Sequence, residues 1–343
     1  MTAKTLSKEN FKKFAENLVK SERTIGVKAK ETKYEFGNIN NADEIVMDYD
    51  VTLRSPRTFF QPPKEKLFDF KLGANTEIKP NIEADPFVLL GIHSYDLKAL
   101  NQMDIIWDEN NADQHYKARR NAATVIALEP TQASEWSFWG SMDSSTVDKG
   151  YDLLLTDIGN KYYVEVGTEK GANLLSKYAS AEDATNDDNT ARDKVRSELP
   201  NLCKADRKVK CDTDGITASM KNSYNNAIWE KLAEKCYSCG SCNLVCPTCY
   251  CFDVKDTIEL DLATGQRTRK WDGCLLEPFA KVAGDENFRE NRADRFRHRI
   301  LRKTVYVADK LNGELACVGC GRCSSTCLPD ITDPVKILNE LCS

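Results

Sequence analysis

The sequence predicts an α+β protein, with a mixed α/β domain over residues 1–200 and a mainly helical domain over residues 201–343. Three observations lead to this division. Short apolar runs alternate with helical patterns in about the first 170 residues. A polar stretch rich in Ala, Asp, Asn and Lys follows Ala172. All 14 cysteines lie beyond that stretch, from Cys203 onward.

The first domain begins with a helix over 6–21, where apolar side chains recur at helical spacing. Residues 45–49 and 51–53 favour extended backbone, and an irregular loop follows over 54–63. The apolar runs 86–92 and 123–128 predict two buried strands, with a helix over 97–106 between them. Residues 151–166 predict a hairpin that turns at Gly159-Asn160. We expect a helix, a polar loop and a helix over 172–199, and further helical structure over 216–235.

Composition limits the classes of function. Hydrophobic residues make up 41% of the 343 residues, which is enough for a buried core, and the net charge of -5 gives no reason to expect a nucleic-acid partner. No uncharged apolar stretch approaches the roughly 18–20 residues that cross a bilayer. The charged N-terminus has no apolar signal core. We therefore expect a cytoplasmic protein without a membrane span, in which disulfides are disfavoured and the cysteines indicate metal binding.

Eight of the cysteines form two copies of one motif. Each copy has three cysteines separated by two residues, and a fourth after three more. This spacing is typical of [4Fe–4S] ferredoxins, in which the fourth cysteine of each motif ligates the other cluster. The sequence therefore predicts that the second domain is ferredoxin-like and binds two [4Fe–4S] clusters. One cluster is expected on Cys236, Cys239, Cys242 and Cys327, and the other on Cys317, Cys320, Cys323 and Cys246.

A zinc site and a purely structural role both fit this motif less well. A zinc ribbon uses two separated pairs of cysteines, which does not match three cysteines in close succession. Eight purely structural cysteines would have no reason to repeat the same spacing. Gly240, Gly319 and Gly321 fit the tight turns that a cluster requires, because glycine reaches positive φ without steric cost.

Three further cysteines, Cys249, Cys251 and Cys274, lie on the segment between the motifs. Two interpretations stay open. They form a third metal centre, such as a third iron–sulfur cluster, or they are small buried residues beside the two clusters. A third centre would need one more ligand, for which the candidates are Asp253, His298, Cys203 and Cys211. We expect no role for Cys342, which lies one residue from the end of the sequence.

The segment between the motifs also carries a strongly basic helix. Residues 288–303 contain seven Arg or Lys against two Asp or Glu, with Phe296 and Ile300 on an apolar edge. Such a helix is either a solvated face with salt bridges, or a surface that offsets the charge of thiolate-ligated clusters or docks an acidic partner. Its position between the two motifs favours a role close to the clusters.

The chain resembles the iron–sulfur β subunit of soluble [NiFe] sulfhydrogenases, a pattern shared by the corresponding iron–sulfur subunit of anaerobic sulfite reductase. The resemblance is carried by CGSCNLVCPTCYCFDVKD, by the stretch from Arg269 to Lys303 and by CVGCGRC. Segments 55–70, 91–100, 140–142 and 150–171 are similar too, so it covers most of the chain. Relatives often have cysteine within 91–96 and just before 140, where this chain has no cysteine and carries Trp136 and Trp139. Leu328 stands where a proline is usual.

The resemblance implies a subunit that passes electrons between an FAD/[2Fe–2S] subunit, which meets NAD(P)H, and a catalytic subunit of hydrogenase or sulfite-reductase type. The N-terminal domain would be the docking platform. The sequence has no phosphate-binding, dinucleotide-binding or zinc-peptidase motif, so no catalytic residue is assigned. Two alternatives stay open: a substrate or flavin held by the N-terminal domain near residues 86–106, and a scaffold in which the clusters are purely structural.

Overall fold

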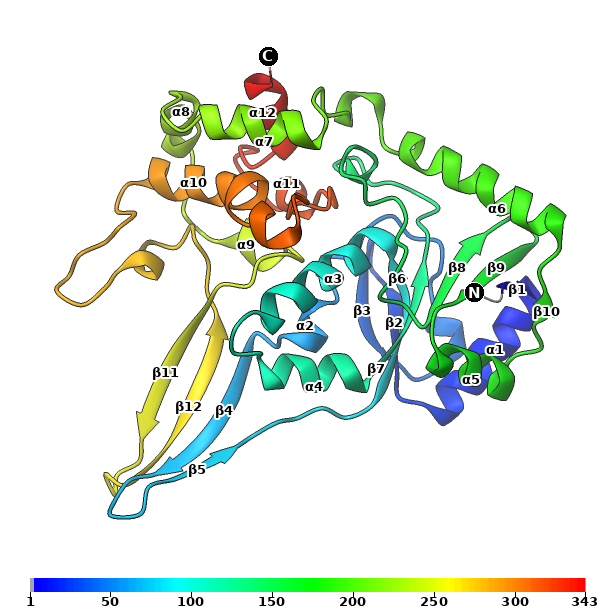
Figure 1. Ribbon diagram of the computed structural model, residues 1–343, viewed down its shortest axis with the longest axis horizontal. Coiled ribbons are helices and arrows are strands. Elements are labelled where there is room, and N and C mark those ends of the chain that lie inside the picture. The colour runs from blue at the N-terminus through cyan, green and yellow to red at the C-terminus, as the bar shows by residue number, and fades with distance from the viewer. Residues whose placement is uncertain (1–2, 343) are drawn as a thin grey trace.

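The computed structural model describes residues 3–342 and is built on two sheets (Figure 1). The larger sheet contains β1 (Ala3–Ser7), β2 (Thr24–Lys30), β3 (Lys33–Ile39), β6 (Phe87–His93), β7 (Ala123–Leu128), β8 (Leu153–Asp157), β9 (Lys161–Val166) and β10 (Glu182–Asp183). Their order across the sheet is β10-β1-β9-β8-β7-β6-β2-β3. The central strands β2, β6, β7 and β8 are parallel, and the outer strands pair antiparallel.

Helices cover both faces of the larger sheet (Figure 1). On one face lie α1 (Lys8–Ser21) and α5 (Glu169–Tyr178), and on the other lie α3 (Ser94–Asp108) and α4 (Gln114–Ala122). Along β7, Val125 belongs to the core under α3 and α4, whereas Ile126 belongs to the core under α1 and α5. Central strands buried on both faces read as continuous apolar runs. The mixed α/β character of the N-terminal part is therefore confirmed.

Most of the predicted elements are present with shifted ends. The two apolar runs form β6 and β7, and the predicted hairpin is β8 and β9. The expected helix, loop and helix are present as α5 and α6 (Asn186–Glu198), but most of the polar stretch forms α6, and the loop before it contains the short strand β10. Residues 45–53 form no strand beyond one isolated bridge between Tyr34 and Thr52. The strands of this region are β2 and β3, whose Gly26, Gly37 and lysines dilute the usual strand signal.

The expectation of a mainly helical second half is not confirmed. Helices α7 (Thr213–Asn222), α8 (Ile228–Glu234), α10 (Arg292–Leu301) and α12 (Pro334–Leu341) do pack together, around Ile216, Trp229 and Phe296. The segment between the cysteine motifs, however, forms a hairpin of β11 (Phe252–Ile258) and β12 (Thr264–Trp271). This hairpin pairs with β4 (Lys64–Lys71) and β5 (Glu77–Pro80), giving a four-stranded sheet that projects from the molecule (Figure 1). Within residues 3–342, no helix is long and apolar enough to span a membrane.

Two buried groups of charges join the halves of the sequence. Arg322, from the second cysteine motif, donates two hydrogen bonds of 2.6 Å to the carboxylate of Asp96 and one of 2.7 Å to the carbonyl of Thr52. In the smaller sheet, Glu65 accepts hydrogen bonds from Arg119 and Arg269. Removing one partner of such a buried pair leaves an uncompensated charge. These contacts therefore fix how the cysteine-rich half sits on the α/β half.

We predict that Asp96→Asn lowers the free energy of unfolding by about 3–5 kcal/mol, because Arg322 would stay buried without its carboxylate partner. The measurement is urea unfolding of the anaerobic protein followed by tryptophan fluorescence. The matched control is Asp256→Asn, which removes an exposed pair with Arg267. Exposed pairs contribute little, so the control should unfold like the wild type. Equal stability of the two variants would contradict the role given to Asp96.

Candidate iron–sulfur centres

The two cysteine motifs adopt the same backbone conformation. Ser238 and Gly319, at matching positions, have φ of 52° and 67°, and Gly240 and Gly321 have φ of 73° and 76°. Each motif then enters a short helix, α9 (Ser241–Leu244) or α11 (Arg322–Ser325), whose third and fourth amides donate to the carbonyl of the glycine that precedes the helix. The predicted positive φ at the three glycines is confirmed. The repeated turn directs amides toward sulfur, as in the hydrogen bond from the Ser238 amide to Cys236 Sγ at 3.4 Å.

Cysteines from both motifs line one enclosed cavity, together with Phe138 and other apolar side chains. These cysteines are Cys317, Cys320 and Cys323 from the second motif and Cys246 from the first. Burial raises the pKa of the three thiols of the second motif to about 12, because a thiolate in this cavity would lose its hydration. A bound iron ion would take the place of each proton. The donor set and the largely apolar cavity, which Arg299 and Lys303 also line, therefore fit a thiolate-ligated cluster.

The other four motif cysteines are Cys236, Cys239, Cys242 and Cys327, none of which lines that cavity. Cys236 and Cys242 belong to the helical core, and Cys327 packs against it. Burial raises the pKa of Cys242, and the Cys327 thiol adds to this effect, so the two sulfurs lie near one another. Cys239 is exposed, and a hydrogen bond with Ser241 lowers its pKa. The first motif thus combines two buried cysteines with one that faces solvent.

The basic helix α10 places a buried cation between the two sets of cysteines. Arg299 Nε donates to Cys242 Sγ at 3.3 Å, and its Nη2 donates to the carbonyl of Cys242 at 3.0 Å. Burial alone would lower the pKa of Arg299, but the Cys242 and Cys323 thiols, one from each motif, hold it well above its usual range. The predicted position of this helix close to the cysteine motifs is therefore confirmed for Arg299. Phe296 and Ile300 are buried on its apolar edge, as expected.

We predict that Arg299→Gln makes the reduction potentials of both clusters more negative, because the added electron would lose a nearby positive charge. A tenfold change in a one-electron equilibrium corresponds to about 59 mV, and we expect a shift of this order. The measurement is a redox titration followed by electron paramagnetic resonance (EPR). Arg297→Gln is the matched control on the same helix, since Arg297 pairs with Asp294 instead. A similar shift in the control would show that overall charge, rather than position, sets the potentials.

The three cysteines between the motifs gather around Asn243. Asn243 Nδ2 donates to Cys274 Sγ at 3.4 Å and to Cys249 Sγ at 3.7 Å. The side chains of Cys251 and Cys274 hydrogen-bond to each other. The structure therefore brings Cys249, Cys251 and Cys274 together, although the sequence places Cys274 more than 20 residues away.

The four candidate extra ligands have other contacts. Asp253 pairs with Lys270, and the ring of His298 packs against Tyr306. Cys203 packs against the core around Trp139. Cys211 forms a disulfide with Cys342, so the expectation that Cys342 has no role is wrong. That pair lies 131 residues apart in the sequence and brings together the segment before α7 and the end of α12.

Among residues 3–342, no three His, Cys, Asp or Glu side chains are placed to share a single metal ion. This holds for both quartets and for the group around Asn243. An iron–sulfur cluster has a different requirement, because each of its cysteines binds a separate iron atom. What matters for a cluster is therefore which cysteines surround a common space, and not whether their sulfurs converge on one point.

The usual ligand-binding edge of the α/β sheet is covered by the second motif. Ligands of such sheets bind beyond the carboxyl ends of the parallel strands. At that edge His93 is fully buried, stacked on Tyr49 with ring centres 3.8 Å apart, with Nδ1 2.9 Å from Tyr95 Oη. His93 therefore does not face a cleft. Arg322 covers the same edge of the sheet, where it donates two hydrogen bonds to the carboxylate of Asp96.

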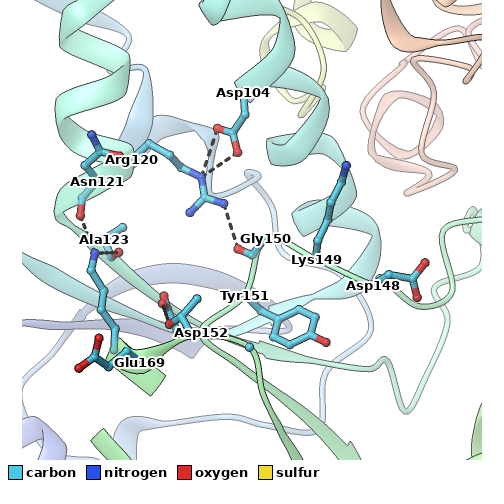
Figure 2. Close-up of a pocket in the computed structure, with 13 residues that line it drawn as sticks. Asp104, Arg120, Asn121, Ala123, Asp148, Lys149, Gly150, Tyr151, Asp152 and Glu169 are labelled. Atoms are coloured by element: carbon cyan, nitrogen blue, oxygen red, sulfur yellow. Dashed lines mark hydrogen bonds and ion pairs between the residues drawn. The ribbon is translucent and has the colours of Figure 1, made fainter. Parts of the chain in front are cut away.

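An open cavity of about 750 Å³ lies at the opposite, amino-terminal edge of the strands (Figure 2). Arg120 crosses it, donating to the carboxylate of Asp104 and to the carbonyl of Gly150 at 2.9 Å. The Lys170 ammonium donates to the carbonyl of Asn121 at 2.7 Å. Two of the cations that line this cavity, Arg120 and Lys170, are thus already engaged with protein groups.

Two residues beside the sulfurs were missed at the level of sequence. Arg57 lies in the segment SPRTFF and is the first residue of the short helix α2 (Arg57–Phe60). Its guanidinium donates a hydrogen bond to the carbonyl of Cys249. Asn243 lies inside the first motif, between Cys242 and Cys246. The only sequence signal for Arg57 is the resemblance of its segment to the sulfhydrogenase family, which does not state what the side chain touches.

Comparison with known proteins agrees with this geometry. The family model for a 4Fe-4S dicluster domain matches residues 235–331, the stretch that spans both motifs. The chain is therefore a dicluster iron–sulfur protein that carries two [4Fe–4S] clusters. It is 31% identical over 336 residues to the sulfhydrogenase 2 subunit beta of Pyrococcus furiosus, covering 98% of this chain and 97% of that relative. The chain belongs to the family of sulfhydrogenase β subunits, which confirms the predicted resemblance.

Proposed function

We propose that this chain is the electron-relay subunit of a cytoplasmic oxidoreductase complex. It would pass electrons through its two clusters between a flavin subunit that meets NAD(P)H and a catalytic subunit of hydrogenase or sulfite-reductase type. The observation that carries the proposal is the cavity lined by Cys246 and the second motif, beside a first motif that reaches the surface. The relative's name, the β subunit of a sulfhydrogenase, supports an assembly with further subunits.

In this proposal the two motifs exchange their fourth cysteines. The inner cluster is held by Cys317, Cys320, Cys323 and Cys246, and the outer cluster by Cys236, Cys239, Cys242 and Cys327. The clusters supply one-electron chemistry, while the protein excludes water from the inner cavity and balances charge through Arg299. Because Arg299 faces thiols of both motifs, it stabilises the added electron on either cluster.

The outer cluster is the natural point of exchange with a partner. Cys239 is exposed, the neighbouring Tyr237 is 72% exposed, and Leu328, next to Cys327, is 92% exposed. Of the inner cysteines, Cys320 is buried under the N-terminal half, where it packs with Tyr95 and Trp139. Cys246, Cys317 and Cys323 are half-buried. One partner would therefore exchange electrons with the outer cluster at the surface around Tyr237. The other partner would exchange electrons with the inner cluster through the α/β half that covers it.

We predict that Cys239→Ala and Cys320→Ala each lose or convert a different cluster, the outer in the first variant and the inner in the second. These two clusters account for about eight irons, and each variant should hold about four irons fewer than the wild type if its cluster is lost. Iron and sulfide analysis and EPR of anaerobic protein measure this. Cys203→Ala, outside both motifs, should keep the wild-type spectrum. Zinc in place of iron, or the same EPR signal lost in both variants, would contradict the assignment.

We also expect one of the chains that co-purify anaerobically from the native source to contain flavin. A stable lone monomer would count against the relay. Absorbance of the separated chain tests the first alternative, since a bound flavin would favour a cofactor site in the N-terminal half. Redox titration tests the second, since clusters that no physiological reductant reduces would favour a scaffold.

A further inference from the structure

Three cysteines beside the clusters are not used by the proposed relay. Cys249 and Cys251 follow the first motif directly, while Cys274 comes after the β11–β12 hairpin. At the base of this hairpin Phe252 pairs with Trp271, and the Asp272 amide donates to the carbonyl of Cys251 at 3.0 Å. The two ends of the hairpin thus lie side by side, and Cys274, which follows its second strand, lies against Cys251, which precedes its first strand.

Asn243 organises these three sulfurs. Its side chain is 1% exposed, and its Nδ2 donates to the sulfurs of both Cys249 and Cys274. Its Oδ1 is buried and has no hydrogen-bond partner among the residues that the structure describes. A buried polar atom without a partner is costly. The orientation of the Asn243 amide is thus set by the hydrogen bonds of its Nδ2 to the sulfurs of Cys249 and Cys274.

A buried cation faces the same sulfurs. Arg57 is 3% exposed, its guanidinium lies 3.6 Å from the ring centre of Trp271, and its Nε has no hydrogen-bond partner within residues 3–342. Burial lowers the pKa of Arg57, and the Cys249, Cys246 and Cys251 thiols oppose that effect. Protonated thiols would leave this cation uncompensated in the interior, whereas thiolates bound to iron would balance it.

Arg302 provides a second positive charge on the same side. Its guanidinium lies over the ring of Tyr250, 4.6 Å from the ring centre. Tyr250 is the residue between Cys249 and Cys251 in the sequence. Arg302 also lies close enough to Cys251 to favour its thiolate. Arg57 and Arg302 come from different segments, so the group of three sulfurs has positive charge on more than one side.

The three sulfurs also lie next to both motifs. The side chains of Cys249 and Cys246 hydrogen-bond to each other, and Asn243, which contacts the sulfurs of Cys249 and Cys274, directly follows Cys242 in the sequence. Cys246 belongs to the proposed inner cluster and Cys242 to the outer one. A redox centre at this place would therefore adjoin the ligands of both clusters.

We propose that Cys249, Cys251 and Cys274 bind a third iron–sulfur cluster, separate from the two ferredoxin-like clusters. The inference deepens the proposed relay and rests on it. Each thiol gives up its proton when it binds iron. Three thiolates suffice for a three-iron cluster, or for a four-iron cluster whose last iron takes a ligand other than cysteine. The third cluster adds a redox centre beside the path between the outer and inner clusters.

The test uses the full chain, purified without oxygen and reconstituted with ferrous iron and sulfide. Iron and acid-labile sulfide are counted per chain, and the reduced and oxidised forms are examined by EPR. The wild type should hold about three or four irons beyond the roughly eight of two cubanes. Cys251→Ala and Cys274→Ala should each remove this excess and its EPR signal, while the signals of the two cubanes persist. Cys203→Ala, a cysteine outside the group, should retain the full iron content.

The outcomes separate the third cluster from the relay itself. A wild type with roughly eight irons, unchanged in Cys251→Ala, overturns the third cluster and leaves the relay intact. A wild type with clearly fewer irons, insensitive to Cys239→Ala, overturns the proposed relay as well. If the alanine variants do not fold, the wild-type iron count and its number of distinct EPR signals decide the question without them.

Discussion

Taking many thiolates out of water is the constraint on which the rest of this structure depends. Loss of hydration raises the pKa of the Cys317, Cys320 and Cys323 thiols to about 12. Only a cation can keep such sulfurs anionic in the interior. Iron supplies most of the positive charge. Arg299 and Lys303 lie close to the sulfurs and balance part of the negative charge that remains. The basic helix α10 is therefore an electrostatic complement to the cysteine motifs, although it shares no residue with them.

The same constraint explains the joining of the two halves of the chain. The second motif could not be buried by its own helices alone, because α11 is a short helix with polar neighbours. It is instead covered by the edge of the α/β sheet, where Asp96 pairs with Arg322 and Trp139 packs beside Cys320. The edge at which related folds leave a ligand crevice is thereby occupied. The edge of the sheet that binds ligands in related folds here covers the second cysteine motif instead.

What could be predicted from the sequence was set by local rules. The quartets, their turns at Gly240, Gly319 and Gly321, and the buried strands β6 and β7 follow from spacing and from continuous apolar runs. The pairing of β12 with β4 could not be predicted, because it joins segments about 200 residues apart and neither strand shows a clean alternation. The contacts of Arg57 and the pairing of Cys211 with Cys342 depend on the same long-range packing. Side chains that act through distant contacts leave no local pattern to read.

The hairpin β11–β12 illustrates how such a long-range feature serves the site. A dicluster fold needs only a connection between its two motifs, and a short loop would make it. This chain inserts a hairpin that pairs with β4, so that Trp271 and Arg57 meet beside Cys249. The insertion thus adds a projecting sheet and places Cys274, one buried cation and one aromatic ring around sulfurs that neither quartet uses. A connection that served only to link the motifs would not need to build that environment, and this is the strongest structural reason to assign those sulfurs a chemical role.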